Sequence, residues 1–198
     1  DVIDVDFGFG HLSDSARLQL AEQYARITKR WLLIFSDVES AHLWRLAGEA
    51  HGLEYARTCF WRRTNAQPQR TGDRPAAFCE AIICMHGRGK KRWNGGGKVG
   101  DYAHATVQGR DRKHPTQKPV ALLRQLVADF TDPGELILDS HAGSGTTGAA
   151  CLELGRRFIG WELDPKHYAT ASKRLAEASK QQPLFKAATT QEQERLPL

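Results

Sequence analysis

Apolar residues follow two patterns along the chain, a helical spacing of three to four residues and short apolar runs of strand length. The first pattern predicts helices over 14–29, 40–52, 119–130, 146–154 and 165–178. The second predicts strands over 31–35, 55–61, 78–85, 135–138 and 158–161. Because strands and helices alternate in the last third, with a glycine-rich turn between them, the order predicts an α/β fold. Apolar strands of this kind suit a parallel sheet with helices on both faces.

Two segments break these patterns. Glycines and cations dominate residues 86–113, where no helix or strand period is visible, so we expect a loop there. Residues 181–198 are polar, and we expect a flexible C-terminal tail. A chain of 198 residues is long enough for one core. We therefore predict one domain over 1–180, with the loop at 86–113 inside it.

Composition narrows the class of protein. The chain is 40% apolar and 26% charged, which is typical of globular proteins, and it has no apolar run long enough for a membrane span. Its acidic start predicts no signal peptide. The four cysteines form no Cys-x-x-Cys pair, so we expect neither a zinc site nor a disulfide scaffold. We interpret them as buried apolar residues in a reducing compartment: Cys59, Cys79, Cys84 and Cys151.

The charge distribution is uneven. Residues 57–113 contain 13 Lys or Arg against four Asp or Glu, a net charge of +9, so the rest carries −4 of the total of +5. This asymmetry suits a polyanion facing one part of the surface. A basic loop face without a partner is the alternative, and charge alone does not separate the two.

The stretch with the most chemical information runs from 136 to 148, where a strand leads into a glycine turn at the start of a helix. Gly143 and Gly145 allow a ligand to approach the backbone, and the helix N-terminus offers unpaired N–H groups. Such a turn suits a phosphate or the methionine end of an adenosyl cofactor. Glu162 follows Gly143 by 19 residues, where an acid could accept hydrogen bonds from both ribose hydroxyls. A structural turn with a surface glutamate is the alternative.

Three motifs in sequence order resemble the DNA amino-methyltransferases that make N6-methyladenine or N4-methylcytosine. They are Asp139-x-x-Ala142-Gly143-Ser144-Gly145-Thr146-Thr147, His114-Pro115-Thr116-Gln117-Lys118-Pro119, and the strand 155–165 with its acid. The resemblance implies a Rossmann-like methyltransferase fold with S-adenosylmethionine as cofactor. The implied cofactor-binding residues are Asp139, Ala142, Gly143, Ser144, Gly145, Thr146, Glu162, Thr116, Gln117 and Lys118.

Within this set, Lys118 could pair with the cofactor carboxylate, and the helix that starts at Pro119 adds its N-terminal dipole. The chain departs from the family at Ser140-His141, where the family usually has Pro-Phe. The phenylalanine commonly packs near the cofactor, so the departure bears on cofactor affinity.

The family's catalytic tetrad is Asp, Asn or Ser followed by Pro-Pro and an aromatic residue. No two prolines of this chain are adjacent, so the tetrad is absent and the catalytic residues are unknown. The resemblance is to a permuted order, in which we expect the tetrad upstream of Asp1 together with two further strands. A relative that lacks the tetrad altogether, a non-catalytic DNA- or cofactor-binding protein, is the alternative.

The loop at 86–113 occupies the place of the family's variable DNA-reading region. We expect Trp93 to stack on a base and the cations of the loop to contact phosphates. These cations are Arg88, Lys90, Lys91, Arg92 and Lys98. Four more cations extend this surface: Arg62, Arg63, Arg70 and Arg74. The resemblance implies that Phe35, Ser36 and Asp37 lie near the target-base pocket; a buried strand end with a capping aspartate is the alternative.

The resulting prediction is a cytoplasmic DNA methyltransferase that acts on the exocyclic amine of adenine (N6), with N4-cytosine as the alternative. DNA is the expected partner, no membrane is involved, and a homodimer is left open. Methyl transfer to RNA or protein is a second class, which the His114–Pro119 motif and the permuted order disfavour.

Overall fold

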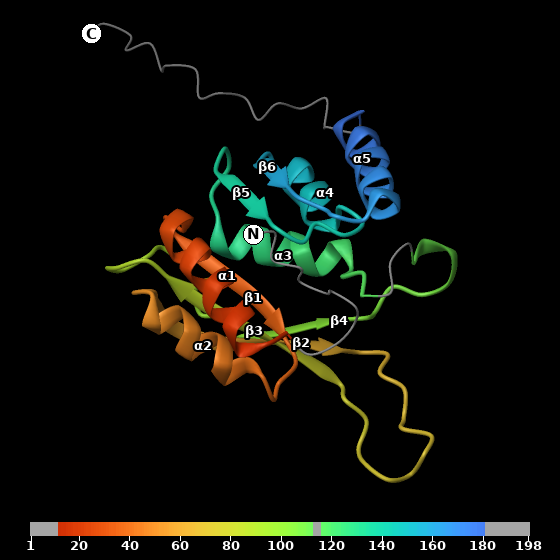
Figure 1. Cartoon of the computed structure of the whole chain (residues 1–198). Coiled ribbons are helices and arrows are strands. Elements are labelled where there is room, and N and C mark those ends of the chain that lie inside the picture. Colours follow the sequence, from red (N-terminus) through yellow and green to blue (C-terminus); the bar gives the residue numbers. More distant parts are fainter. Residues whose placement is uncertain (1–11, 113–115, 181–198) are drawn as a thin grey trace, which may run out of the picture.

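The computed structural model describes residues 12–112 and 116–180 and shows an α/β fold (Figure 1). The elements in chain order are α1 (Asp14–Ile27), β1 (Trp31–Ser36), α2 (Ala41–Ala50), β2 (Glu54–Arg63), β3 (Cys79–His86), β4 (Asp101–His104), η1 (Gly109–Asp111), α3 (Val120–Phe130), β5 (Leu136–Asp139), α4 (Thr146–Glu153), β6 (Arg157–Gly160) and α5 (Pro165–Lys180). Every helix and strand predicted from the sequence is present, and the ends agree to within two residues.

The sequence analysis predicted a loop over the whole segment 86–113, and the structure corrects this prediction. It contains β4 and the single turn η1. β4 pairs in parallel with the end of β2, and Tyr102 in its middle is buried. Four residues are too few to show a strand period, which is why the pattern missed this element.

The expectation of a parallel sheet is confirmed for β5 and β6 but is wrong for most of the larger sheet. The four-stranded sheet has the order β1-β3-β2-β4, and β3 is antiparallel to both β1 and β2. β2 and β3 follow one another in the chain and pair directly, which requires opposite directions. The only parallel pairs of the described residues are β2 with β4 and β5 with β6, the latter forming a separate two-stranded sheet.

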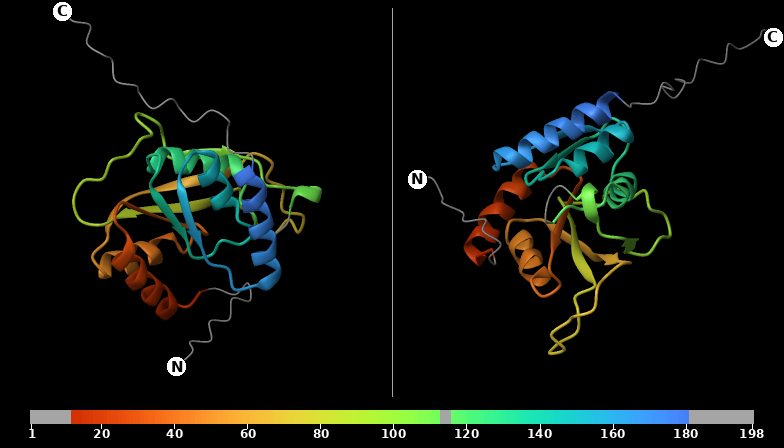
Figure 2. Two further views of the ribbon diagram at one scale, coloured as in Figure 1. Left: turned by 90° about the horizontal axis from the view of Figure 1, so that it is seen from above. Right: turned by 90° about the vertical axis from the view of Figure 1, so that its right-hand side faces the viewer.

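Helices cover both faces of the larger sheet, as predicted. On one face, β2, β3 and β4 pack against α3, with Ile82, Leu122 and Leu126 buried at the contact. On the other face, α1 and α2 cover β1 and β3 through a cluster around Trp44 and Ile83. The views in Figure 2 show α4 and α5 on the far side of the β5–β6 sheet from α1 and α2.

Within the described ranges, no helix combines the length and the apolar character that crossing a bilayer requires. The tail predicted over 181–198 and the start of the motif His114–Pro119 lie outside the described residues.

Candidate functional site

A cleft of about 2340 Å3 lies between β1 and β5. Trp31–Val38 line one side of it, and Leu136–Ala142 with the glycine loop line the other. Neither facing edge has a strand partner among the described residues, because β1 pairs only with β3 and β5 only with β6. The cleft therefore runs along two open strand edges and reaches the carboxyl ends of both strands, where α/β folds place their ligands.

The glycine loop forms one wall at the carboxyl end of β5. Gly143 and Gly145 have φ angles of +53° and +74°, which side chains adopt only with strain. A Cβ on Gly145 would lie 3.0 Å from the Ala171 Cα, so α5 packs against the loop from behind. A Cβ on Gly143 would meet nothing closer than 3.9 Å, so this part of the loop backbone is open to a ligand. The loop delivers the chain to α4, whose N-cap Gly145 leaves the first amides without a side-chain cap.

Asp139 organises this loop. One carboxylate oxygen accepts from the His141 N–H at 3.0 Å, and the other accepts from the Thr147 hydroxyl at 2.7 Å. The side chain therefore ties the end of β5 to the first turn of α4. The sequence prediction had placed Asp139 in the cofactor site, and the structure gives it this internal role at the border of the cleft.

Glu162 stands at the end of β6 as the sequence predicted, but its carboxylate supports the loop. One oxygen accepts from the Gly143 N–H at 2.8 Å and the other accepts from the Asp164 N–H at 2.9 Å. Each oxygen keeps a further lone pair, so the carboxylate can still accept a bond from a ribose hydroxyl. Its predicted role in cofactor binding stays a prediction.

Arg174 on α5 is a residue of the loop that the sequence did not reveal. Its guanidinium donates to the Ser144 carbonyl at 2.7 Å and to the hydroxyls of Ser144 and Thr146 at 2.9 Å each. Burial lowers the pKa of Arg174 from its ordinary value. No spacing rule connects a cation on α5 with the glycine turn 30 residues earlier. The only signal was its place on the helix that follows the strand with the acid.

Ser140 and His141, the two positions that depart from the family pattern, form a polar chain with α1. The Tyr24 hydroxyl lies 2.8 Å from Ser140 Oγ, which lies 2.9 Å from His141 Nδ1. Burial raises the pKa of Tyr24, so its hydroxyl stays protonated and able to donate. The serine thus gives α1 a direct bond to the cofactor loop, which a proline side chain cannot provide.

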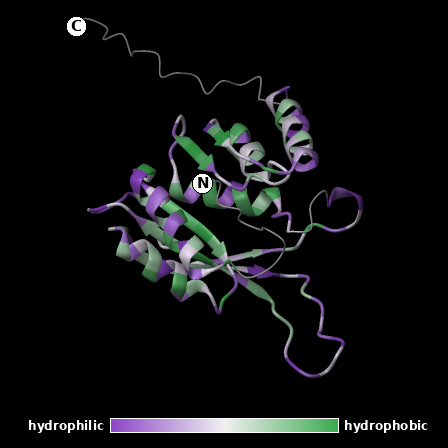
Figure 3. Cartoon of the chain, viewed as in Figure 1, coloured by the Kyte–Doolittle hydropathy of each residue, from purple (hydrophilic) through white to green (hydrophobic). Residues whose placement is uncertain are grey.

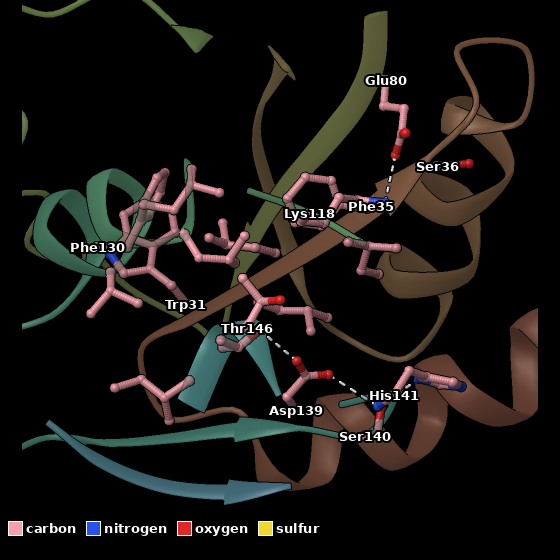
Figure 4. A pocket seen from close by; sticks show the side chains of 18 of the residues that line it. Trp31, Phe35, Ser36, Glu80, Lys118, Phe130, Asp139, Ser140, His141 and Thr146 are labelled. Atoms are coloured by element: carbon pink, nitrogen blue, oxygen red, sulfur yellow. Dashed lines mark hydrogen bonds and ion pairs between the residues drawn. The ribbon is translucent and has the colours of Figure 1, made fainter. Parts of the chain in front are cut away.

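Lys118 lies on the opposite wall of the cleft from the glycine loop (Figure 4). Its ammonium is 2.9 Å from the Glu80 carboxylate and stands over the rings of Phe35 and Trp61, 5.0 and 5.5 Å from their centroids. The predicted partner was the cofactor carboxylate, and the structure supplies a protein carboxylate instead. Thr116 and Gln117 also line the cleft, as predicted for neighbours of the site.

The predicted stacking of Trp93 on a base stays a prediction. Its ring packs against Phe130, with centroids 6.3 Å apart, and lies partly buried against the main core cluster. The carbonyl of the preceding residue, Arg92, accepts from the Trp31 indole at 2.7 Å, which holds this part of the loop against the start of β1. The Trp93 ring is therefore held against the body of the protein, although it is only partly buried.

The cations predicted to contact phosphates divide into two groups. Lys98 lies 2.6 Å from the buried carboxylate of Asp129, and Arg92 lies 3.6 Å from Asp132, so both neutralise acids of the protein. Arg88 and Lys90 are exposed, and Lys91 donates to the Arg88 carbonyl. No residue of 87–100 lines the cleft. This loop follows the carboxyl end of β3, which is beside the amino end of β1, whereas the glycine loop follows the carboxyl end of β5.

Comparison with known proteins gives this geometry a context. The DNA methylase family of N6 and N4 methyltransferases matches residues 88–173. The DNA adenine methyltransferase YhdJ of Escherichia coli K12 is 46% identical over 66 residues, 33% of this chain and 22% of that protein. The type II methyltransferase M2.DpnII of Streptococcus pneumoniae is 27% identical over 202 positions, 88% of this chain and 74% of the relative. The matched segment thus spans under a third of the first Escherichia coli relatives.

Solved structures of DNA methyltransferases are also similar to this chain. The M1.HpyAVI–SAM complex superposes with a TM-score of 0.72 at 28% identity, covering 80% of this chain and 81% of that one. The cytosine-N4-specific PvuII DNA methyltransferase gives a TM-score of 0.69 at 12% identity over 86% and 78% of the two chains, which shows the fold alone. The family match over residues 88–173, the relatives and the strand–glycine loop–helix geometry all show that the chain is similar to the DNA amino-methyltransferases.

Proposed function

We propose that the chain binds S-adenosylmethionine at the glycine loop between β5 and α4. The main observation in support is the open backbone at Gly143, beside the N-terminus of α4, which has no side-chain cap. The N–H of Gly143 donates a hydrogen bond to the Glu162 carboxylate. The backbone amides would receive the methionine end of the cofactor, and Glu162 would accept from the ribose. When bound, S-adenosylmethionine supplies the activated methyl group.

The ligand class is tested by titration calorimetry with S-adenosylmethionine and, separately, with ATP. A glycine turn at a helix N-terminus also suits a phosphate, so ATP is the matched competitor. We expect binding of S-adenosylmethionine and none of ATP. Preference for ATP would reject the proposal.

We propose DNA as the methyl acceptor and the exocyclic amine of adenine as the position modified, in a cytoplasmic enzyme. The support is the similarity to a DNA adenine methyltransferase, 46% identical over 66 residues. N4-cytosine is the alternative, because the family covers both bases. Labelled methyl transfer to unmethylated DNA, followed by nucleoside analysis, distinguishes N6-methyldeoxyadenosine from N4-methyldeoxycytidine.

Catalysis needs groups that the sequence from Asp1 to Leu198 does not contain, because no two of its prolines are adjacent. We propose that a strand carrying the tetrad pairs with the open edges of β1 and β5 and ends beside Ser36 and the glycine loop. The backbone groups of both edges would then be paired. Methyl transfer would be measured with a protein that includes this strand.

Residues 1–198 alone are expected to bind the cofactor without transferring its methyl group. Turnover by these residues would contradict the assignment of catalysis to a further segment. If addition of a tetrad-bearing strand gives cofactor binding but still no transfer, the non-catalytic alternative is favoured.

A further inference from the structure

We infer that the loop between β2 and β3, residues 64–78, is an arm that holds duplex DNA beside the cleft. This inference rests on the proposed function and names the surface through which the DNA partner is held. The sequence analysis gave this role first to the cations of 88–98 and named Arg70 and Arg74 only as an extension of that surface.

The arm leaves the sheet at the end where the cofactor loop lies. Ser36, the last residue of β1, pairs with Ala81 near the start of β3, so the arm begins and ends beside the carboxyl end of β1. Figure 1 shows it projecting from the end of the sheet at which the β1 arrow points, and the right view of Figure 2 shows it standing away from the body. Residues 75–78 at its base line the cleft.

The base of the arm is braced. The Asn65 side chain donates to the Thr106 carbonyl at 3.3 Å and accepts from the Thr106 N–H at 2.8 Å. The Trp61 indole donates to the His104 carbonyl at 3.0 Å, which ties the end of β2 to the same segment. The arm therefore projects from a fixed root, although its outer part is polar and exposed (Figure 3).

The chemistry of the arm suits a nucleic acid. Arg70 and Arg74 are exposed on its outer part, and Arg74 forms an exposed ion pair of 2.7 Å with Asp73, the only acid of the loop. Phe78 is 56% exposed and lines the cleft at the base of the arm. Two guanidinium groups on the outer part of the arm could contact phosphates, and the accessible ring at its base offers a stacking surface at the cleft.

The competing surface is at the wrong end of the strands. Arg88 and Lys90 lie beyond the carboxyl end of β3, next to the amino end of β1, and contribute nothing to the lining of the cleft. Arg92 and Lys98 of the same loop are engaged with acids of α3 and the turn after it. Charge favours that loop, but its position does not bring a bound duplex to the cofactor.

The test compares two double variants of equal charge change, R70A/R74A in the arm and R88A/K90A in the competing loop. Affinity for a DNA duplex is measured by fluorescence anisotropy with S-adenosylmethionine present, at several salt concentrations. Each lost phosphate contact reduces the slope of log K against log salt by about 0.9, so R70A/R74A should reduce it by roughly 1.8. R88A/K90A should leave the slope unchanged.

Different results would contradict the DNA-binding arm and the proposed function. Salt-dependent DNA binding that survives R70A/R74A, or that is lost in R88A/K90A instead, would overturn the arm and leave the proposed function standing. A parent chain that binds S-adenosylmethionine but shows no salt-dependent affinity for DNA would overturn both the DNA partner and the arm. A thermal melt of each variant verifies that the fold is retained.

Discussion

Tyr24 and Ser140 are 116 positions apart in the chain, and their hydroxyl oxygens lie 2.8 Å from one another. This bond joins α1 to the end of β5 at the cofactor loop. At the other end of the cleft, the Arg30 guanidinium donates to Glu135 at 2.7 Å and to Asp132 at 2.9 Å. Because no strand of the described residues lies between β1 and β5, these two polar bridges help to set the spacing of the cleft.

Tyr24→Phe removes the first bridge without changing the shape of the ring. We expect it to lower the free energy of unfolding by about 1 kcal/mol, the usual net value of one hydrogen bond, and to weaken S-adenosylmethionine binding several-fold. Tyr55→Phe is the matched control, because its hydroxyl bonds to Thr58 within β2, far from the loop. Equal cofactor affinities in the two variants would show that the Tyr24 bond does not position the loop.

The second bridge gives a pH dependence. A hydrogen bond from Asn94, together with the Arg30 guanidinium, lowers the pKa of the Asp132 carboxyl from its ordinary value near 4. A carboxyl whose pKa is lower in the folded state contributes stability above the ordinary pKa, and this contribution is lost as the pH falls through the lowered value.

Urea unfolding of the parent and Asp132→Asn between pH 3 and 6 measures this contribution. The stability advantage of the parent should be largest at pH 5 to 6 and should shrink below about pH 4. An advantage that is constant over this range would mean that the ionisation of Asp132 is not linked to folding.

The elements were predictable from the sequence to a greater extent than the way they pair. Apolar runs located β1, β3 and β5, although only β3 is largely buried and Leu136 and Leu138 of β5 are exposed. The direction of β3 depends on its pairing with β2, which no local pattern encodes. The glycine loop was found because positive φ angles restrict residue type at Gly143 and Gly145. The partners Tyr24, Glu80 and Arg174 were missed because their contacts are long-range and carry no spacing rule.

Glu80→Gln tests whether Lys118 reaches the cofactor. The ion pair with Glu80 now holds the ammonium of Lys118, and the substitution removes the charge while keeping the side-chain shape. If the cofactor carboxylate competes for Lys118, as the family resemblance implies, Glu80→Gln should tighten S-adenosylmethionine binding several-fold in calorimetry. Unchanged affinity would leave Lys118 outside the cofactor site.

Trp93→Ala separates a core role from a DNA role. The ring packs against Phe130 in the main core cluster, so we expect a loss of roughly 2–3 kcal/mol in the free energy of unfolding. The salt dependence of DNA affinity should be that of the parent. A stable variant with weakened DNA binding would support the stacking role instead.

The central claim, a cofactor site at the glycine loop, is tested most directly by calorimetry on Gly143→Ala and Gly155→Ala. Both glycines have positive φ angles, +53° and +70°, and neither added Cβ would meet an atom closer than 3.9 Å. The free energy of unfolding should therefore fall by a similar amount in each variant, about 1–2 kcal/mol. Only the Gly143 methyl stands where the cofactor approaches the loop. The account predicts S-adenosylmethionine affinity at least ten-fold weaker in Gly143→Ala and unchanged in Gly155→Ala, and equal affinities in the two variants would contradict it.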